Sequence, residues 1–211
     1  MRSNAHNLFL TRSTLPTHEN LNVADLPQLD AARHKLREHI LQHSLKTGSF
    51  TLKSGRTSTW FLDSKQTACR SDGILLVTDV ALAMLPPDID AIGGLTMGAD
   101  PVAFGIAAVA ATRGRTLRSF SVRKESKDHG VTGRIAGALQ SGDRVAIVED
   151  TVTRGTSLFE AVEVVKAFGA TPVFITVIVD RGGTCAAMAS AANIVYQPML
   201  TALDLGYAFG S

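Results

Sequence analysis

Residues 145–157, which read VAIVEDTVTRGTS, decide the fold of this chain. The stretch begins with the apolar run VAIV, which is directly followed by Glu149 and Asp150. A short, continuous apolar run is typical of a strand that is buried on both faces of a parallel sheet. The two carboxylates (the acid pair) therefore lie at the end of a predicted central strand, at the edge where open α/β sheets bind ligands.

A polar turn and a predicted helix follow the acid pair. From Thr156 onward apolar residues recur at helical spacing, and Gly169 predicts the end of the helix. The start of a helix offers unpaired N–H groups and the positive end of a dipole, so residues 153–157 (the phosphate loop) are suited to a phosphate. The acid pair can accept hydrogen bonds from sugar hydroxyls, or hold a metal ion that bridges sugar and phosphate. Together these features predict a site for a phosphorylated sugar.

An apolar run, two acids and Thr-x-Gly-Thr-Ser resemble the phosphoribosyl pyrophosphate (PRPP) signature of the type I phosphoribosyltransferases. The resemblance implies an α/β fold, in which a parallel sheet is flanked by helices and carries a small N-terminal hood. Glu149 and Arg154 depart from the common signature, which has Asp and a small residue at these positions. For this stretch alone, an ordinary strand–turn–helix with a capping Thr or Ser is the alternative. The implied PRPP-binding residues of the stretch are Glu149, Asp150, Thr151, Val152, Thr153, Arg154, Gly155, Thr156 and Ser157.

The composition predicts one domain without a strong electric field. The chain has 211 residues, of which 45% are hydrophobic and 19% charged, enough for one well-buried α/β domain. Its net charge of +2 indicates neither a nucleic-acid partner nor a membrane partner, and no apolar run approaches the length of a membrane span. Cys69 and Cys185 are far apart and show no metal-binding pattern. This indicates a reducing compartment, so we expect a cytoplasmic protein.

The N-terminal segment differs in character from the rest. Residues 1–26 are polar and without periodicity, so we expect a flexible extension, with a transit peptide as the alternative. Residues 27–211 then form a single phosphoribosyltransferase domain, which begins with a predicted helix over residues 29–47. On this helix His39 and His43 are four residues apart, a spacing that can bind a metal ion. Because we find no Cys or acid grouped with them to complete a site, we expect solvated histidines.

Residues 48–64 predict a hairpin (the hood). Apolar residues alternate on both of its arms, and the turn SGR joins them. The pattern FTLKSG followed by STWF resembles the hood of the orotate phosphoribosyltransferases. This resemblance implies that Lys53 binds the base or the pyrophosphate, and that Trp60 and Phe61 shape the base pocket. A hairpin with core aromatic residues and a solvated lysine is the alternative.

A second glycine-rich segment, residues 93–101, follows a short predicted strand and precedes an apolar helix. Its glycines allow the backbone to approach a ligand closely, which predicts a second anion-binding loop. The resemblance implies that this loop faces pyrophosphate. The Tyr-Lys pair of a common family version is absent here, so we assign no contacts to individual residues of the loop.

Residues 123–137 form a polar, glycine-rich stretch between two predicted strands, which predicts a mobile loop (the lid). Its cations would gather only around a polyanion and would then exclude water from the reacting bond. The motif RKESKDHG, which begins at Arg123, resembles the catalytic loop of the orotate phosphoribosyltransferases. The resemblance implies that Lys127 is the main catalytic cation, helped by Arg123 and His129, and that these residues and Lys124 bind PRPP. It also implies a homodimer in which the lid reaches the neighbouring subunit's site, whereas a solvated charge run is the alternative.

A second buried strand is predicted over residues 173–179 and is followed by Asp180 and Arg181. Its carboxyl end lies at the same sheet edge as the acid pair. The resemblance implies that Arg181 binds the carboxylate of orotate, for which a guanidinium is geometrically suited. A structural salt bridge to Asp180 or Asp204 is the alternative. We expect no chemistry from the remaining tail.

The resemblance as a whole predicts transfer of phosphoribose from PRPP to orotate, which gives orotidine 5′-monophosphate and pyrophosphate in the biosynthesis of UMP. The leaving pyrophosphate gains charge, so the reaction needs electrostatic stabilisation, and Mg²⁺ is the implied cofactor, held through PRPP with Asp150 as an optional ligand. Two alternatives stay open: a phosphoribosyltransferase for another base, such as a purine, and a PRPP-binding regulator of RNA or DNA. The implied orotate-binding residues are Lys53, Phe61, Thr153 and Arg181, and Lys53 is also an implied PRPP ligand.

Overall fold

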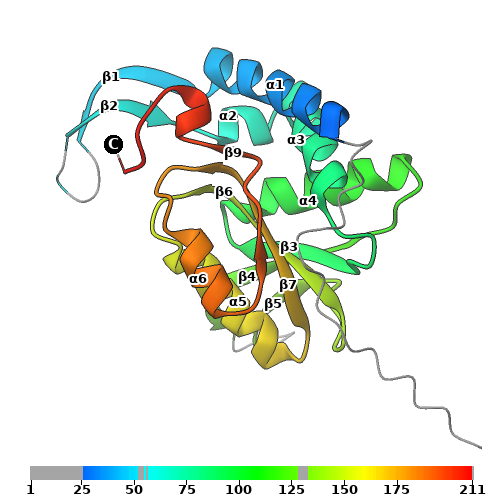
Figure 1. Ribbon diagram of the computed structural model, residues 1–211. Coiled ribbons are helices and arrows are strands. Elements are labelled where there is room, and N and C mark those ends of the chain that lie inside the picture. The colour runs from blue at the N-terminus through cyan, green and yellow to red at the C-terminus, as the bar shows by residue number, and fades with distance from the viewer. Residues whose placement is uncertain (1–25, 52–54, 56, 128–132, 211) are drawn as a thin grey trace, which may run out of the picture.

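The computed structural model describes residues 26–51, 55, 57–127 and 133–210. The expected N-terminal extension, apart from Leu26, lies outside the described residues, as do Lys53 and His129. The described chain forms a central sheet with helices on both sides and a separate two-stranded sheet (Figure 1). This is the predicted α/β arrangement.

The central sheet has seven strands in the order β5-β4-β3-β6-β7-β8, with β9 also paired to β7. All of these pairs are parallel except β4 with β5. Two of these strands, β8 and β9, are only two residues long. The strands are Ala91–Leu95 (β3), Arg118–Lys127 (β4), Gly133–Gly137 (β5), Arg144–Val152 (β6), Thr171–Asp180 (β7), Val195–Tyr196 (β8) and Leu200–Thr201 (β9).

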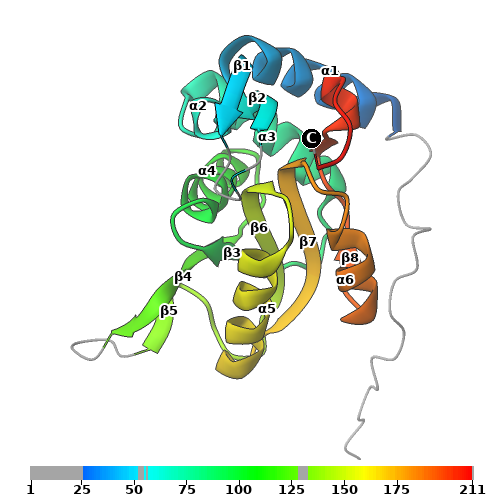
Figure 2. The same ribbon diagram turned by 90° about the vertical axis from the view of Figure 1, so that its left-hand side faces the viewer.

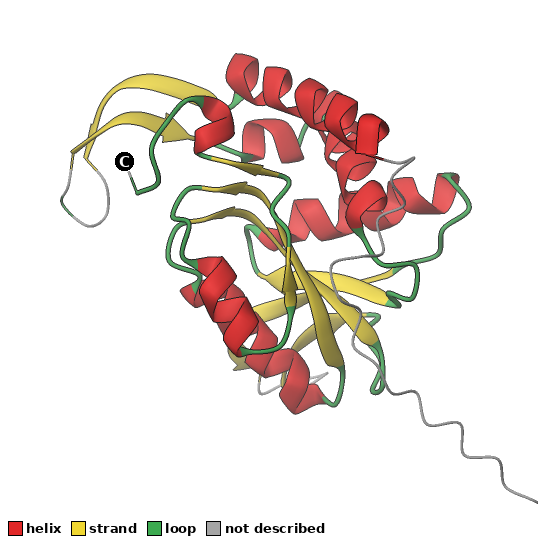
Figure 3. Cartoon of the chain, in the orientation of Figure 1, coloured by secondary structure: helices red, strands yellow, loops and turns green. Residues whose placement is uncertain are grey.

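The apolar run of β6 is buried on both faces of the sheet, as predicted. Val145 and Ile147 belong to the core cluster that includes residues of α5 and α6. Ala146 and Val148 belong to the cluster that includes residues of α1, α3 and α4. Successive side chains of a strand point to opposite faces, so one short run supplies both layers of core. Helices cover both faces of the sheet (Figure 3). The helices are Leu26–His43 (α1), Ser71–Met84 (α3), Ala99–Thr112 (α4), Thr156–Phe168 (α5) and Cys185–Ala191 (α6).

The hood is an antiparallel hairpin of β1 (Leu45–Thr51) and β2 (Thr57–Leu62), which is followed by the short helix α2 (Lys65–Ala68). The hairpin is confirmed, but it starts before residue 48. The helix that was expected to reach residue 47 ends at His43, because Leu45 already pairs with Leu62.

The C-terminal segment lies beside the hood and α1 (Figure 1). It contains the 3₁₀ helix Leu203–Leu205 (η2). The carbonyl of Asp204 accepts a hydrogen bond from Arg37 Nε of α1 at 2.6 Å. The ring of Tyr207 stacks on Trp60 of the hood, with 4.5 Å between the centroids. The end of the chain therefore helps to fix the hood.

The lid differs from its prediction. Instead of one loop, β4 and β5 extend into it as an antiparallel hairpin, in which Val122 pairs with Ile135 and Lys127 with Gly133. Antiparallel pairing satisfies backbone groups that a loop would leave to water. Figure 2 shows this hairpin projecting from the edge of the sheet, away from the hood. The prediction of a loop is therefore wrong for both arms, and residues 128–132 between them lie outside the description.

Candidate active site

The phosphate loop joins β6 to α5 through Gly155. This residue has a φ of 84°, and a Cβ atom on it would lie 2.9 Å from Cys185 Sγ, so both conformation and packing require glycine. No described side chain caps the start of α5, which argues against the alternative of a capping Thr or Ser. Thr156 and Ser157 are exposed. The first turn of α5 therefore presents its N–H groups to a ligand, as a phosphate site requires.

The acid pair is buried near the carboxyl end of β6, where Glu149 and Asp150 are each 7% exposed. The glycine-rich segment lies directly against it. A Cβ atom on Gly98 would lie 2.0 Å from Glu149 Oε1 and 2.7 Å from Asp150 Oδ1. A Cβ atom on Gly94 would lie 2.1 Å from the carbonyl oxygen of Val148. We expected these glycines to let the backbone approach a ligand. They also allow it to pack closely against β6 and the acid pair.

Asp100 fixes the glycine-rich segment at the start of α4. Its Oδ2 accepts a hydrogen bond from Thr96 Oγ1 at 2.6 Å, and its Oδ1 accepts one from Ser121 Oγ of β4 at 2.6 Å. The peptide bond between Thr96 and Met97 is cis. The segment is therefore held from two neighbouring strands, β4 and β6.

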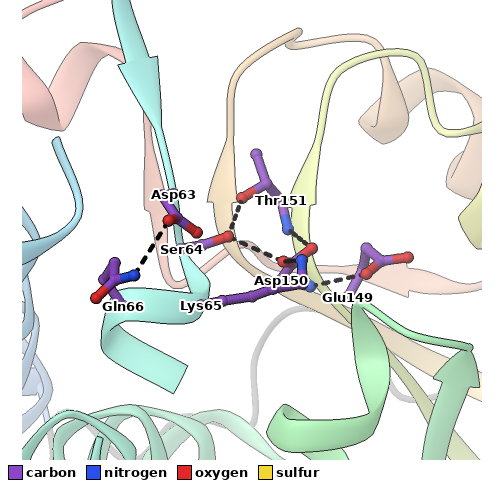
Figure 4. Close-up of polar contacts among 7 residues, drawn as sticks. All are labelled: Asp63, Ser64, Lys65, Gln66, Glu149, Asp150 and Thr151. Atoms are coloured by element: carbon purple, nitrogen blue, oxygen red, sulfur yellow. Dashed lines mark hydrogen bonds and ion pairs between the residues drawn. The ribbon is translucent and has the colours of Figure 1, made fainter. Parts of the chain in front are cut away.

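Ser64 and Lys65 contact the acid pair, although sequence analysis did not identify them. Lys65 Nζ lies 2.6 Å from Asp150 Oδ2, and Ser64 Oγ donates to the same oxygen at 3.0 Å (Figure 4). Thr151 completes the network, because its Oγ1 donates to Ser64 Oγ at 2.8 Å and its N–H to Asp150 Oδ1 at 2.8 Å. The one sign of this contact in the sequence was a lysine soon after a predicted hood strand. The hood thus brings a cation to an acid that lies 85 positions away.

The two carboxyl groups of the acid pair titrate in opposite directions. Burial and the charge of Asp150 raise the pKa of Glu149 to about 8. Burial also opposes ionisation of Asp150, but the hydrogen bond and charge of Lys65 outweigh it and hold the pKa of Asp150 below its usual value. Burial therefore favours the protonated form of Glu149, and Lys65 favours the ionised form of Asp150. The pair can offer sugar hydroxyls both a donor and several acceptors.

Arg181 lies at the end of β7 beneath the hood. Its Cζ lies 4.0 Å from the centroid of the Trp60 ring, in cation–π geometry. Trp60 is fully buried and is stacked on its other neighbour, Tyr207. Burial lowers the pKa of Arg181. The aromatic stack therefore orients the guanidinium, and Trp60 acts as a core residue, as the alternative reading of the hood expected.

The two acids expected as alternative partners of Arg181 bind other donors. Asp180 Oδ1 accepts the N–H groups of Gly182 and Gly183, each at 2.9 Å, and its Oδ2 accepts Tyr196 Oη at 2.8 Å. Asp204 Oδ2 accepts the N–H and hydroxyl of Thr201 at 2.6 and 2.7 Å. The contacts of Asp180 shape the turn after β7, and those of Asp204 join β9 to the 3₁₀ helix η2.

The turn after β7 also touches the phosphate loop. Arg181 N donates to the carbonyl of Val152 at 2.8 Å, and Thr184 Oγ1 donates to the carbonyl of Thr153 at 3.1 Å. A Cβ atom on Gly182 would lie 1.6 Å from that same carbonyl oxygen of Thr153. The structure therefore brings Arg181 and Thr153, two implied orotate-binding residues, to one place.

Phe61, another implied orotate-binding residue, lies on the opposite face of β2 from Trp60. Side chains of β2 alternate between buried and exposed, and Phe61 is 40% exposed. Its ring centroid lies 5.7 Å from that of Phe50. The structure does not bring Phe61 to Arg181, so its contact with the base stays a prediction.

The described lid cations lie on the projecting hairpin. Arg123 Nη1 donates to the carbonyl of Gly133 at 3.4 Å, and Lys124 is exposed. Arg134 forms an ion pair with Glu160 of α5, which ties the hairpin to that helix. Only the backbone of Lys127 is described, as the last residue of β4. The described part of the lid therefore lies beside α5, and its described cations belong to β4 and β5.

Several known proteins that are similar to this chain are orotate phosphoribosyltransferases. No protein-family model matches the chain. The orotate phosphoribosyltransferase of Streptomyces avermitilis is 39% identical to it over 171 residues, which cover 80% of this chain and 94% of the relative. The crystal structure of the Mycobacterium tuberculosis orotate phosphoribosyltransferase with Fe(III) dicitrate has a TM-score of 0.73 at 35% identity. The structure of the same enzyme with PRPP has a TM-score of 0.70 at 31% identity, and each covers 83% of this chain and 99% of the other.

None of the helices in the described ranges is long and apolar enough to cross a membrane. The similarity in sequence extends over most of both chains, and the similarity in structure confirms the expected type I phosphoribosyltransferase fold. The chain therefore belongs to the orotate phosphoribosyltransferase family.

Proposed function

We propose that this chain carries out the reaction of its family, in which PRPP and orotate give orotidine 5′-monophosphate and pyrophosphate during the biosynthesis of UMP. One observation carries the proposal: two buried carboxyl groups lie beside an uncapped helix start at the ligand-binding edge of the sheet. Carboxyl oxygens suit the ribose hydroxyls, and the helix start suits the 5′-phosphate. This arrangement supports PRPP as the substrate.

The residues of the site divide the work of the reaction. Residues 153–157 hold the 5′-phosphate, while Glu149 and Asp150 hold the ribose hydroxyls. Breaking the bond at C1 leaves an oxocarbenium-like ribose and a pyrophosphate with added charge. The lid cations stabilise that charge and bind PRPP. They are Arg123, Lys124, Lys127 and His129.

Mg²⁺ fits the donor set, because carboxylate and phosphate oxygens are its preferred ligands. Asp150 is the residue best placed to take part, although Lys65 occupies its Oδ2 and would have to give up that contact. When bound, the ion neutralises charge on the pyrophosphate group. The chain's own contribution is to hold the ribose and to exclude water from the reacting carbon.

Arg181 selects the base. A guanidinium forms two parallel hydrogen bonds with a carboxylate, which orotate has and a purine lacks. The stack of Trp60 and Tyr207 supports this assignment, because it limits the orientations that the guanidinium can adopt. Lys53 and Thr153 are the further contacts that we propose for orotate, together with Phe61.

The remaining parts of the proposal concern assembly and location. We propose a homodimer in which each lid reaches the neighbouring site, since the hairpin projects beyond the sheet edge of its own chain (Figure 2). We propose residues 27–211 as one domain that follows a flexible extension of residues 1–26. Cys69 and Cys185 are free thiols, which supports a reducing compartment such as the cytoplasm.

The test is the loss of orotate ultraviolet absorbance when the purified chain meets orotate, PRPP and Mg²⁺, with pyrophosphate release measured in parallel. Adenine, hypoxanthine and uracil serve as competing bases. Turnover of orotate alone is the expected result. Turnover of another base instead would overturn the role of Arg181, and inactivity on every base, together with salt-dependent binding of RNA or DNA, would support the regulator.

A further inference from the structure

Two histidines and an aspartate meet where α1 crosses the start of α3. His39 and His43 lie on successive turns of α1, and Asp72 lies in the first turn of α3. Their side-chain ligand atoms all lie within 4.8 Å of one another, and the two imidazole centroids are 4.5 Å apart. Sequence analysis found no acid grouped with these histidines. The fold supplies one, Asp72, from another helix. None of these residues belongs to the PRPP site.

His39 is held in a fixed orientation. Its side chain is 8% exposed, and Nδ1 lies 3.1 Å from Thr67 Oγ1, which in turn lies 2.6 Å from Ser44 Oγ. Its Nε2 is buried and has no hydrogen-bond partner in the described structure. This nitrogen faces Asp72 Oδ2 at 3.5 Å, beyond normal hydrogen-bond length. A buried polar atom of this kind calls for an explanation.

A metal ion explains this geometry. In metal sites the histidine usually donates its second ring N–H to a nearby oxygen, which fixes the tautomer. In the tautomer whose Nδ1–H donates to Thr67 Oγ1, His39 Nε2 carries the lone pair and faces Asp72 Oδ2.

Asp72 keeps one oxygen for a ligand. Its Oδ1 accepts the N–H of Gly73 at 3.1 Å and lies 3.3 Å from Arg70 Nε. Its Oδ2 is the oxygen that faces His39. The outer side of the cluster is open, because Asp72 is exposed and His43 is half-buried. An ion can therefore enter from solvent and complete its coordination with water.

We propose that His39, His43 and Asp72 form a binding site for a divalent transition-metal ion, with Zn²⁺ as the best match. Two imidazoles at i and i+4 and one carboxylate are typical Zn²⁺ ligands, with a water in the fourth position. Mg²⁺ is a poor match because it prefers oxygen ligands. The proposal does not depend on the reaction at the acid pair.

The ion would join three helices below the hood. His39 and His43 belong to α1 and Asp72 to α3, while Thr67, which holds His39, belongs to α2. The helix α2 also carries Lys65, which reaches Asp150. Binding of Zn²⁺ to the folded chain alone therefore raises its melting temperature by linkage.

The test uses the full chain after chelation, titrated with ZnCl₂ by calorimetry in excess Mg²⁺, which saturates oxygen-ligand sites. The variants His43→Gln and Asp72→Asn remove one ligand each at partly exposed positions, so the fold should persist. His34→Gln changes an exposed histidine on the same helix, and Cys69→Ser removes the exposed thiol near the cluster. We expect one bound Zn²⁺, an affinity that is at least about tenfold weaker in both ligand variants, and no change in both controls.

Two further readouts separate a metal site from a structural cluster. Zn²⁺ should raise the melting temperature of the parent chain but not that of His43→Gln. Co²⁺ should give the intense visible absorption of a tetrahedral site in the parent chain and lose it in Asp72→Asn. The proposal is overturned if the parent chain binds no Zn²⁺, or if His43→Gln and Asp72→Asn bind it as tightly as the parent does.

Discussion

The acid pair and the lid differ in how far the fold alone prepares them. Glu149 and Asp150 are each 7% exposed and are held by Gly98, Ser64 and Lys65. The lid instead carries its cations on a projecting hairpin (Figure 2). Buried, preorganised groups need no rearrangement to bind a substrate, whereas exposed cations gather only when a polyanion is present. From this difference we predict that the two proposed functions, sugar binding and stabilisation of the leaving group, can be separated by mutation.

The largest effect should come from the lid. Lys127→Ala removes the proposed main catalytic cation, and we expect kcat to fall by about 10²–10³, the usual loss for one electrostatic group. The melting temperature should change little, because the acid pair remains intact. Steady-state kinetics and thermal unfolding measure both. Lys166→Ala, an exposed lysine on α5, is the matched control.

A fall in melting temperature for Lys127→Ala would contradict the comparison, because it would mean that the lid also supports the fold. An unchanged kcat would remove Lys127 from the reaction.

Gly98→Ala should instead lower the stability of the fold and weaken the binding of PRPP. The added methyl would lie 2.0 Å from Glu149 Oε1, so the glycine-rich segment or the acid pair must shift. We expect a loss of about 1–3 kcal/mol in the free energy of unfolding, as is usual for overpacking, and a higher KM for PRPP. Urea unfolding and PRPP kinetics measure these. If the free energy of unfolding and the KM for PRPP both stay at the parent values, the contact between Gly98 and Glu149 is loose.

Lys65→Met should test how the ionisation of Asp150 within the acid pair depends on its neighbour. It removes the ammonium group that holds the pKa of Asp150 low, so the acid limb of the pH profile for kcat/KM should move to higher pH. Because Lys65 is partly exposed, we expect a loss of only about tenfold in kcat/KM for PRPP, similar to one hydrogen bond to a charged group. Lys46→Met, an exposed lysine of the hood, is the control. An unshifted acid limb would separate Lys65 from the ionisation of Asp150.

A further effect concerns stability without substrate. Glu149 has a pKa of about 8 in the folded chain, above its usual 4.5, so the folded state binds more protons. Its contribution to stability is therefore complete below its unfolded pKa and is lost as the pH rises through about 8. Glu149→Gln should flatten the pH dependence of the free energy of unfolding over this window. The same slope in parent and variant would show that Glu149 is ionised throughout.

Local patterns in the sequence predicted most of the fold that positions the site. The continuous apolar run before Glu149 identified a central strand, and β6 is buried on both faces. Gly155 and Gly169, both with positive φ, flank α5 where the helical pattern begins and ends. Such signals are readable because burial and backbone conformation act on residues that are close in sequence.

The contacts of the site were harder to predict. Nothing near Lys65 in the sequence points to Asp150, since the pairing depends on how the hood packs over the end of β6. The lid was predicted as a loop because it is rich in charges and glycines, which are typical of loops. Its two arms are strands because they pair with each other. Tyr207 lies in a tail for which no role was expected, yet it stacks on the tryptophan that orients Arg181.

The sequence by itself determined the strand, the acid pair, the phosphate loop and the family resemblance, because each is written in consecutive residues. Tertiary structure alone decided that Lys65 meets Asp150, that Gly98 lies against Glu149, and that Asp72 joins the two histidines of α1. The physical reason is that these contacts depend on the packing of elements far apart in the chain. Their energies come from burial and charge, which a residue acquires only from its neighbours in space.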